Sequence, residues 1–219
     1  MNFIEELTPY IINFYYKSGR KFPWRDYRTP YSVYLSEILL QRTQARQVVP
    51  VFNLLIENYP DVFSLYNDFM VASNVMKSLG RFCRYEVCKH GLHYVIEKFN
   101  GNIPEDKDSL LSIPSIGTYI AAAIRIFGYG LHDTIIDTNV VRVLGRLYGL
   151  QITGEIRRKK YFIELAEKQS CCKDIVAYSY GILDFAFLIC CSKKPLCDQC
   201  NFRLICKYYQ KTIHSKKLN

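Results

Sequence analysis

Two carboxylates stand where the sequence would let them act on a substrate. Asp137 ends an apolar run, residues 134–136, and precedes a helical pattern, whereas Glu37 lies inside an otherwise apolar helical pattern. A carboxylate at a helix start, facing a groove, can stabilise positive charge on a sugar, as in glycoside cleavage. An Asp at this place is also an ordinary N-cap residue, and Glu37 can equally be satisfied by a backbone or Arg partner.

Four of the nine cysteines are spaced as ligands of one metal centre. Cys190, Cys197, Cys200 and Cys206 are separated by six, two and five residues. A structural Zn²⁺ and a [4Fe–4S] cluster are the two candidates. Only one close Cys-x-x-Cys pair is present and the outer ligands flank it, which favours the cluster. The odd number of cysteines and the lack of an export signal make a disulfide framework a poor alternative.

A tight turn at residues 113–117 separates two short helical patterns. Backbone N–H groups at the start of the second helix would be unpaired and could hold a phosphate oxygen. We expect Gly117 to take a conformation that is costly for other residues, and Thr118 to cap the second helix. An ordinary corner between two helices is the alternative.

The composition fits a globular protein with a polyanionic partner. Apolar residues make up 49% of the 219 residues, charged residues 22%, and the formal net charge is +9. Such a charge suits nucleic acid, although a basic protein need not bind anything charged. No apolar run reaches the roughly 20 residues of a membrane span, and the N-terminus lacks a secretory signal. We therefore expect an intracellular, cytoplasmic protein.

Helical periodicity dominates the whole chain, so we predict an all-α fold. Residues 2–19 and 31–46 each read as one amphipathic helix, and residues 161–190 return to a helical pattern. No β-hairpin signal and no alternation of strands with helices interrupts this pattern.

The combined pattern resembles the helix-hairpin-helix DNA glycosylase superfamily in its iron–sulfur branch. Phe22-Pro23-Trp24-Arg25, the segment 36–44 (SEILLQRTQ), the hairpin with Asp137 and the four cysteines occur in the family's order. The resemblance covers nearly the whole chain. Ser115 departs from the family's usual first hairpin Gly.

The resemblance implies two helical domains with a DNA-binding cleft between them. Residues 23–130 would form a six-helix bundle with the hairpin, and residues 1–22 plus 131–219 the iron–sulfur domain. The partner would be double-stranded DNA with a mispaired or damaged base, which the family flips out of the duplex. We expect a monomer without membrane association.

The resemblance also assigns roles to single residues. Asp137 matches the catalytic acid, Asn139 an Asn that orders the site, and Glu37 an acid that acts on the departing base or on water. A raised pKa would let Glu37 act as an acid, and burial would supply it. The expected DNA contacts are Gln41, Arg42, Leu79, Arg81, Pro114, Ile116, Gly117 and Thr118.

Tyr119 stands where endonuclease III carries the Lys that attacks the sugar. A phenol forms no Schiff base, so we expect base removal without efficient strand cleavage. Gln41-Arg42-Thr43 approaches the thymine mismatch enzyme, whereas the Phe22–Arg25 motif is that of the adenine enzyme. Only thirteen residues follow Cys206, so we expect the adenine enzyme's C-terminal domain to be lacking. We favour thymine or uracil opposite guanine; adenine excision and a bifunctional lyase are the alternatives.

Overall fold

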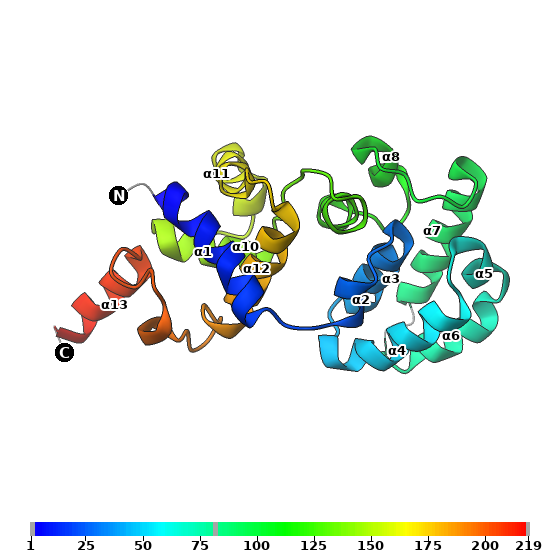
Figure 1. The fold of residues 1–219 in the computed structure, drawn as a ribbon, viewed down its shortest axis with the longest axis horizontal. Helices are drawn as coiled ribbons and strands as arrows, with labels where there is room; N and C mark the ends of the chain where they lie inside the picture. The colour runs from blue at the N-terminus through cyan, green and yellow to red at the C-terminus, as the bar shows by residue number, and fades with distance from the viewer. Residues whose placement is uncertain (1–2, 81–82, 218–219) are drawn as a thin grey trace. The chain divides into compact units, whose positions relative to one another are not determined.

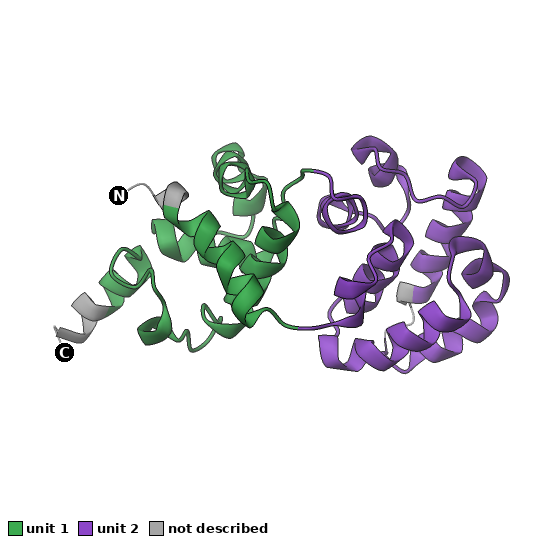
Figure 2. Ribbon diagram, viewed as in Figure 1, with its two compact units in different colours: residues 1–20, 132–219 green, residues 21–131 purple. Residues whose placement is uncertain are grey.

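The computed structural model describes residues 3–80 and 83–217, and the side chains of residues 6–80 and 85–212. All regular structure within these residues is helical, which confirms the predicted all-α class. The chain divides into two compact units, shown in Figure 2: residues 1–20 with 132–219 form unit 1, and residues 21–131 form unit 2. The predicted functional domains, 23–130 and 1–22 plus 131–219, stay a prediction.

Unit 1 joins the first helix to residues 132–219 (Figure 1). Its helices are α1 (Phe3–Ser18), α10 (Thr138–Tyr148), η2 (Ile156–Arg158), α11 (Lys160–Ser170), α12 (Ile175–Leu188), η3 (Cys197–Gln199) and α13 (Lys207–Lys217).

The core of unit 1 forms where α1 packs against α12. Leu7 and Ile11 on α1 are fully buried, and Phe185 on α12 is nearly so. The two helices approach closely at Gly181, where a Cβ atom would lie 2.5 Å from the carbonyl oxygen of Ile11. A larger residue at 181 would push the helices apart, because close-packed backbones cannot give way.

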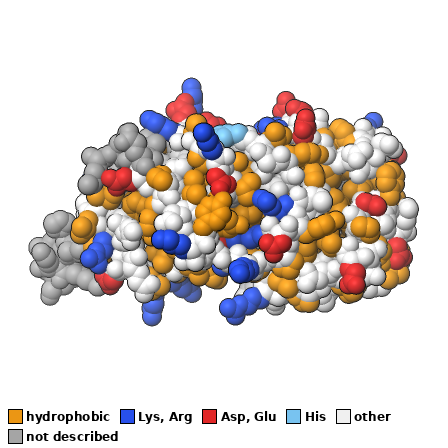
Figure 3. All heavy atoms as spheres, in the orientation of Figure 1, with side chains coloured by type: hydrophobic (Ala, Val, Ile, Leu, Met, Phe, Trp, Pro, Cys, Tyr) orange, Lys and Arg blue, Asp and Glu red, His pale blue; other side chains and the backbone are white. Residues whose placement is uncertain are grey.

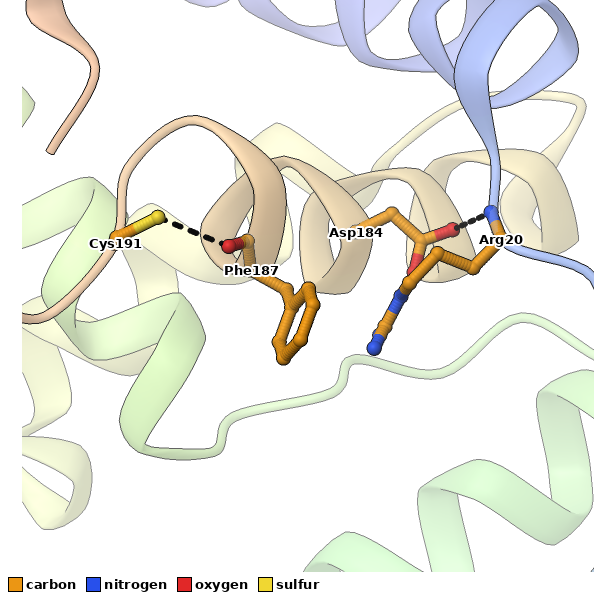
Figure 4. Close-up of polar contacts among 4 residues, drawn as sticks. All are labelled: Arg20, Asp184, Phe187 and Cys191. Carbon is orange, nitrogen blue, oxygen red and sulfur yellow. Dashed lines mark hydrogen bonds and ion pairs between the residues drawn. The ribbon is translucent and has the colours of Figure 1, made fainter. Parts of the chain in front are cut away.

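A buried ion pair fastens the chain after α1 to α12. Asp184 is fully buried and accepts hydrogen bonds from the backbone N–H of Arg20 at 2.8 Å and from its Nε at 2.6 Å. The Arg20 guanidinium also lies over the ring of Phe187, 4.2 Å from its centroid, as Figure 4 shows. The Cys191 thiol donates to the carbonyl oxygen of Phe187 at 3.0 Å, so this end of α12 joins the cysteine segment.

Unit 2 is built from helices, and α3 contacts several of them. The helices differ in length, and α2 has only four residues. They are α2 (Pro23–Asp26), α3 (Pro30–Leu40), α4 (Ala45–Asn58), α5 (Val62–Asn67), α6 (Phe69–Lys77), α7 (Cys83–Phe99), α8 (Lys107–Ser112), α9 (Thr118–Ala123) and the π-helix η1 (Ile124–Gly128).

Helix α3 is the buried centre of unit 2. Thr29 caps it through a capping box, and Pro30 occupies its first turn, where a missing N–H costs nothing. Tyr34, Leu35 and Leu39 are completely buried. The helix packs against η1, α4 and α9, so the hairpin helix α9 rests directly on it.

The predicted single helix over residues 31–46 is wrong. Helix α3 ends at Leu40, and α4 begins at Ala45. Gln41 leaves the helical region with ψ 105°, and Arg42 takes a left-handed φ of 56°. Residues 41–47 contain only one apolar residue, Ala45, so the apolar periodicity does not locate the end of the helix. Gln41 and Arg42 are therefore exposed on a turn rather than on a helix face.

The surface of the two units differs in charge. On the face drawn in Figure 3, Lys and Arg side chains gather over unit 1, whereas the part of unit 2 at the right of the view shows mainly hydrophobic and acidic side chains. None of the helices in the described residues combines the length and apolar character that a membrane crossing needs.

Candidate functional site

Asp137 is the N-cap of α10. Its Oδ1 accepts hydrogen bonds from the backbone N–H groups of Asn139 and Val140, each at 2.8 Å. Burial raises the pKa of Asp137 above its ordinary value, and these hydrogen bonds and the nearby Arg142 oppose the shift. The structural and catalytic interpretations are thus compatible, because Oδ1 caps the helix while burial still raises the pKa of the carboxyl group.

A chain of hydrogen bonds leads from Asp137 along α10. The Asn139 amide donates to Oδ2 of Asp137 at 2.5 Å, and Nη2 of Arg142 donates to Oδ1 of Asn139 at 3.1 Å. Arg142 also donates from Nε to the carbonyl oxygen of Cys190 at 2.9 Å, and from Nη2 to that of Ala186 at 2.8 Å. Asn139 therefore orients the Asp137 carboxylate, and Arg142 in turn holds Asn139 against the cysteine segment.

Arg146, one turn further along α10, holds the same segment. It donates from Nη1 to the carbonyl oxygen of Cys191 at 2.7 Å and from Nη2 to that of Ser192 at 2.8 Å. Its guanidinium lies over the ring of Tyr208, 4.6 Å from the centroid, which ties α13 to α10. Our sequence reading missed Arg142 and Arg146. Their signal was the spacing of residues 139, 142 and 146 on one helix face.

The four predicted metal ligands come together in unit 1. Cys190, Cys197, Cys200 and Cys206 line one small cavity, together with Arg146. Burial, together with the charges of the other three cysteines, raises the pKa of Cys200 to about 11.

The donor set fits a thiophilic centre. Thiolates gathered in this way repel one another, and a metal centre of positive charge would lower their pKa values. Within the described residues no three His, Cys, Asp or Glu side chains are close enough together to ligate one ion. The cysteines thus share a cavity rather than a complete ligation geometry.

A larger cavity adjoins the start of α10. It measures about 540 Å³, and Arg142, Arg146 and Arg157 contribute to its lining together with Thr138 and Thr153. Its described lining residues include three arginines and no acidic residue, so the lining carries a net positive charge.

The hairpin lies in unit 2 between α8 and α9, as predicted, but its geometry differs from the expectation. Ser115 takes the left-handed φ of 87°, whereas Gly117 has an ordinary φ of −100°. Gly117 is itself the N-cap, and Thr118 is the first residue of α9. The expected unusual conformation of Gly117 and the expected capping by Thr118 are therefore wrong, because the left-handed residue of the turn lies two positions earlier, at Ser115.

The remaining predicted site residues of unit 2 lie on different elements. Glu37 is half-buried on α3, and Tyr119 is half-buried on α9 between exposed Thr118 and buried Ile120. Pro114 is exposed in the hairpin, whereas Ile116 is buried and anchors it.

Leu79 lies in the turn after α6. The turn is held by the Tyr85 hydroxyl, which donates to the carbonyl oxygens of Met76 at 2.5 Å and Gly80 at 2.6 Å. Arg81 lies outside the described residues.

Comparison with known proteins decides the family. The chain is 30% identical over 210 residues to the thymine/uracil-DNA glycosylase of Methanothermobacter thermautotrophicus, and the match covers 92% of each chain. The chain belongs to the helix-hairpin-helix DNA glycosylase superfamily. This superfamily consists of enzymes that hydrolyse N-glycosyl bonds, so the predicted family and enzyme class are confirmed.

Two further relatives of this glycosylase chain are informative. A solved thermostable thymine-DNA glycosylase superposes with a TM-score of 0.89 at 28% identity, covering 95% of this chain and 97% of that one. The adenine DNA glycosylase of Buchnera aphidicola subsp. Baizongia pistaciae is 30% identical over 201 residues, which span 91% of this chain but 57% of that enzyme. No family model matches the chain.

Proposed function

We propose that this glycosylase releases thymine or uracil mispaired with guanine in DNA, by hydrolysis and without efficient strand cleavage. The observation that carries the proposal is the likeness to thymine/uracil-DNA glycosylases along nearly the whole length of both chains. The partner is double-stranded DNA, bound by a monomer in the course of base excision repair.

Asp137 stabilises the cationic sugar as the bond to the base breaks. An ionised carboxylate suits this role, and the three hydrogen bonds at Asp137 favour the ionised form against the burial that raises its pKa. Asn139 keeps Oδ2 in place, because its own amide oxygen is fixed by Arg142. Glu37 protonates or polarises the departing base, or orders the attacking water.

The residue at position 119, here Tyr119, determines whether the DNA strand is cleaved after the base is released. A Lys at this position could attack the sugar as an amine and form a Schiff base, which leads to strand cleavage; a phenol cannot. The proposed product is therefore an intact strand with an abasic site.

DNA is held through contacts that carry little sequence information. The hairpin contacts phosphates, Gln41 fills the gap left by the flipped nucleotide, and the turn at Leu79 wedges the other strand. Two observations support these contacts: Gln41 and Arg42 are exposed on a turn, and the arginine-lined cavity beside Asp137 is positive. Arg42, Arg81, Pro114, Ile116, Gly117 and Thr118 complete the proposed DNA-binding set.

Cys190, Cys197, Cys200 and Cys206 hold a [4Fe–4S] cluster in this proposal. When bound, the cluster cross-links the segment rigidly through four thiolates. Arg142 and Arg146 transmit this rigidity to α10 by binding carbonyl oxygens of the same segment. Iron and sulfide analysis tests the assignment: about four of each per chain supports it, whereas zinc in place of iron contradicts it.

A single-turnover panel of duplexes tests the function. It compares G·T, G·U, A·G and A·8-oxoguanine pairs, with hot alkali to reveal abasic sites. Cleavage of G·T and G·U only after alkali is the expected result. Release from A·G instead would favour the adenine alternative, which the Buchnera relative and Glu37 support.

Two controls separate the remaining alternatives. Asp137→Asn should bind the same duplexes without releasing a base. Borohydride should trap no covalent adduct with DNA. A trapped adduct would show that the enzyme is a bifunctional lyase and would contradict the prediction based on Tyr119.

A further inference from the structure

Ser115 occupies a conformation that side chains rarely adopt. Its φ of 87° lies in the left-handed region, where glycine is the usual residue because it has no Cβ. The turn therefore needs an interaction that holds Ser115 in this conformation, since the backbone preference alone opposes it.

That interaction comes from α3. Tyr34 is completely buried, and its hydroxyl oxygen lies 3.2 Å from Oγ of Ser115, a distance at which either group can donate. Cys88 on α7, which is also completely buried, lies near the Tyr34 hydroxyl.

Gly91 on α7 gives the turn the space it needs. A Cβ atom at Gly91 would lie 2.5 Å from the Tyr34 hydroxyl, 2.7 Å from the carbonyl oxygen of Pro114 and 3.0 Å from Oγ of Ser115. Three elements that are distant in the sequence thus meet at one point beneath the hairpin.

We propose that Tyr34 is a positioning residue for DNA binding: its hydroxyl holds Ser115 left-handed and thereby sets the path of the hairpin backbone into Gly117 and α9. The proposal rests on the proposed function, because it assumes that the hairpin contacts DNA. It predicts that the Tyr34 hydroxyl matters only while residue 115 carries a side chain.

The first test compares two tyrosines on the same helix. Tyr31 is also buried on α3, but its hydroxyl donates to the carbonyl oxygen of Tyr59 at 2.9 Å, away from the hairpin. Tyr34→Phe should weaken binding to a fluorescent undamaged duplex about fivefold, the effect of one hydrogen bond. Tyr31→Phe, which also loses a buried hydrogen bond, should leave the affinity unchanged.

The second test is rescue by glycine. Ser115→Gly alone should bind as well as the wild type, and it should restore binding in the Tyr34→Phe background, because glycine adopts the left-handed conformation unaided. Equal affinities of Tyr34→Phe and Tyr31→Phe, or a failure of Ser115→Gly to rescue, would overturn the proposal.

Failure of the proposed function has a different signature. If the wild-type protein binds no duplex DNA, the hairpin does not contact DNA. Urea unfolding of the same variants then measures whether Tyr34 and Ser115 are energetically coupled. Additive effects of Tyr34→Phe and Ser115→Gly on stability would then overturn it, and non-additive effects would support the coupling.

Discussion

Arg142 donates a hydrogen bond from Nε to the carbonyl oxygen of Cys190 at 2.9 Å while its Nη2 holds the amide oxygen of Asn139 at 3.1 Å. One guanidinium therefore connects the cysteine segment with the residue that orients Asp137. Arg142 is not itself placed to touch a substrate in our proposal; it acts through Asn139.

Arg142→Ala should slow base release from bound DNA strongly, beyond the loss of DNA affinity that comes from removing one arginine of the positive cavity. A displaced Asp137 would lose its alignment with the sugar, and a shift of about 1 Å can cost roughly 100-fold in rate. Single-turnover rates and binding isotherms on a G·T duplex measure the two effects. Asp184→Asn serves as the control, because it weakens the same unit without touching the network. Equal loss of activity in both variants would mean that Arg142 acts through stability alone.

Ionisation of Asp137 should destabilise the folded protein as the pH rises. Burial raises its pKa in the folded state above the ordinary 3.8, so the unfolded chain releases its proton first. The stability of Asp137→Asn relative to the wild type should therefore increase from just below pH 3.8 until the pH exceeds the raised pKa, and then stay level. Urea unfolding at a series of pH values gives the difference; a decrease over this interval would show that the pKa is depressed instead.

The Arg20–Asp184 pair should contribute far more to stability than an exposed pair. Asp184 is fully buried, so Arg20→Ala would remove the charged partner of a buried carboxylate and cost about 3 kcal/mol or more. Glu155→Ala removes the exposed pair with Arg158, whose Nη1 lies 3.0 Å from the Glu155 carboxylate, and should cost about 0–1 kcal/mol. Denaturant unfolding measures the loss of unfolding free energy in both variants. Similar losses would contradict the burial of the Arg20–Asp184 pair.

Arg157 should contact the DNA backbone, whereas its neighbour Arg158 should not. Arg157 lines the positive cavity beside the start of α10, while Arg158 pairs with Glu155. Arg157→Ala should weaken duplex binding and reduce the salt dependence by about one counterion. Arg158→Ala is the matched control on the adjacent position; an identical salt dependence in both variants and the wild type would remove the cavity from the DNA interface.

The turn between α3 and α4 shows where sequence reasoning failed. Periodicity reports which residues are buried, but residues 41–47 contain only one apolar residue, the half-buried Ala45, so periodicity could not mark the end of α3. The left-handed φ of Arg42 leaves no mark on that pattern. Ser115 is the same case, since the glycine expected to make the turn at 117 has an ordinary backbone conformation.

The sequence by itself determined the helical class, the family and the cysteine set, because each depends on residue types at fixed spacing. Only the tertiary structure decided how Asp137 is held and which side chains support the hairpin. Arg142 reaches Cys190 across 48 positions, and Tyr34 reaches Ser115 across 81. Such contacts arise from the packing of distant helices, which local preferences do not encode.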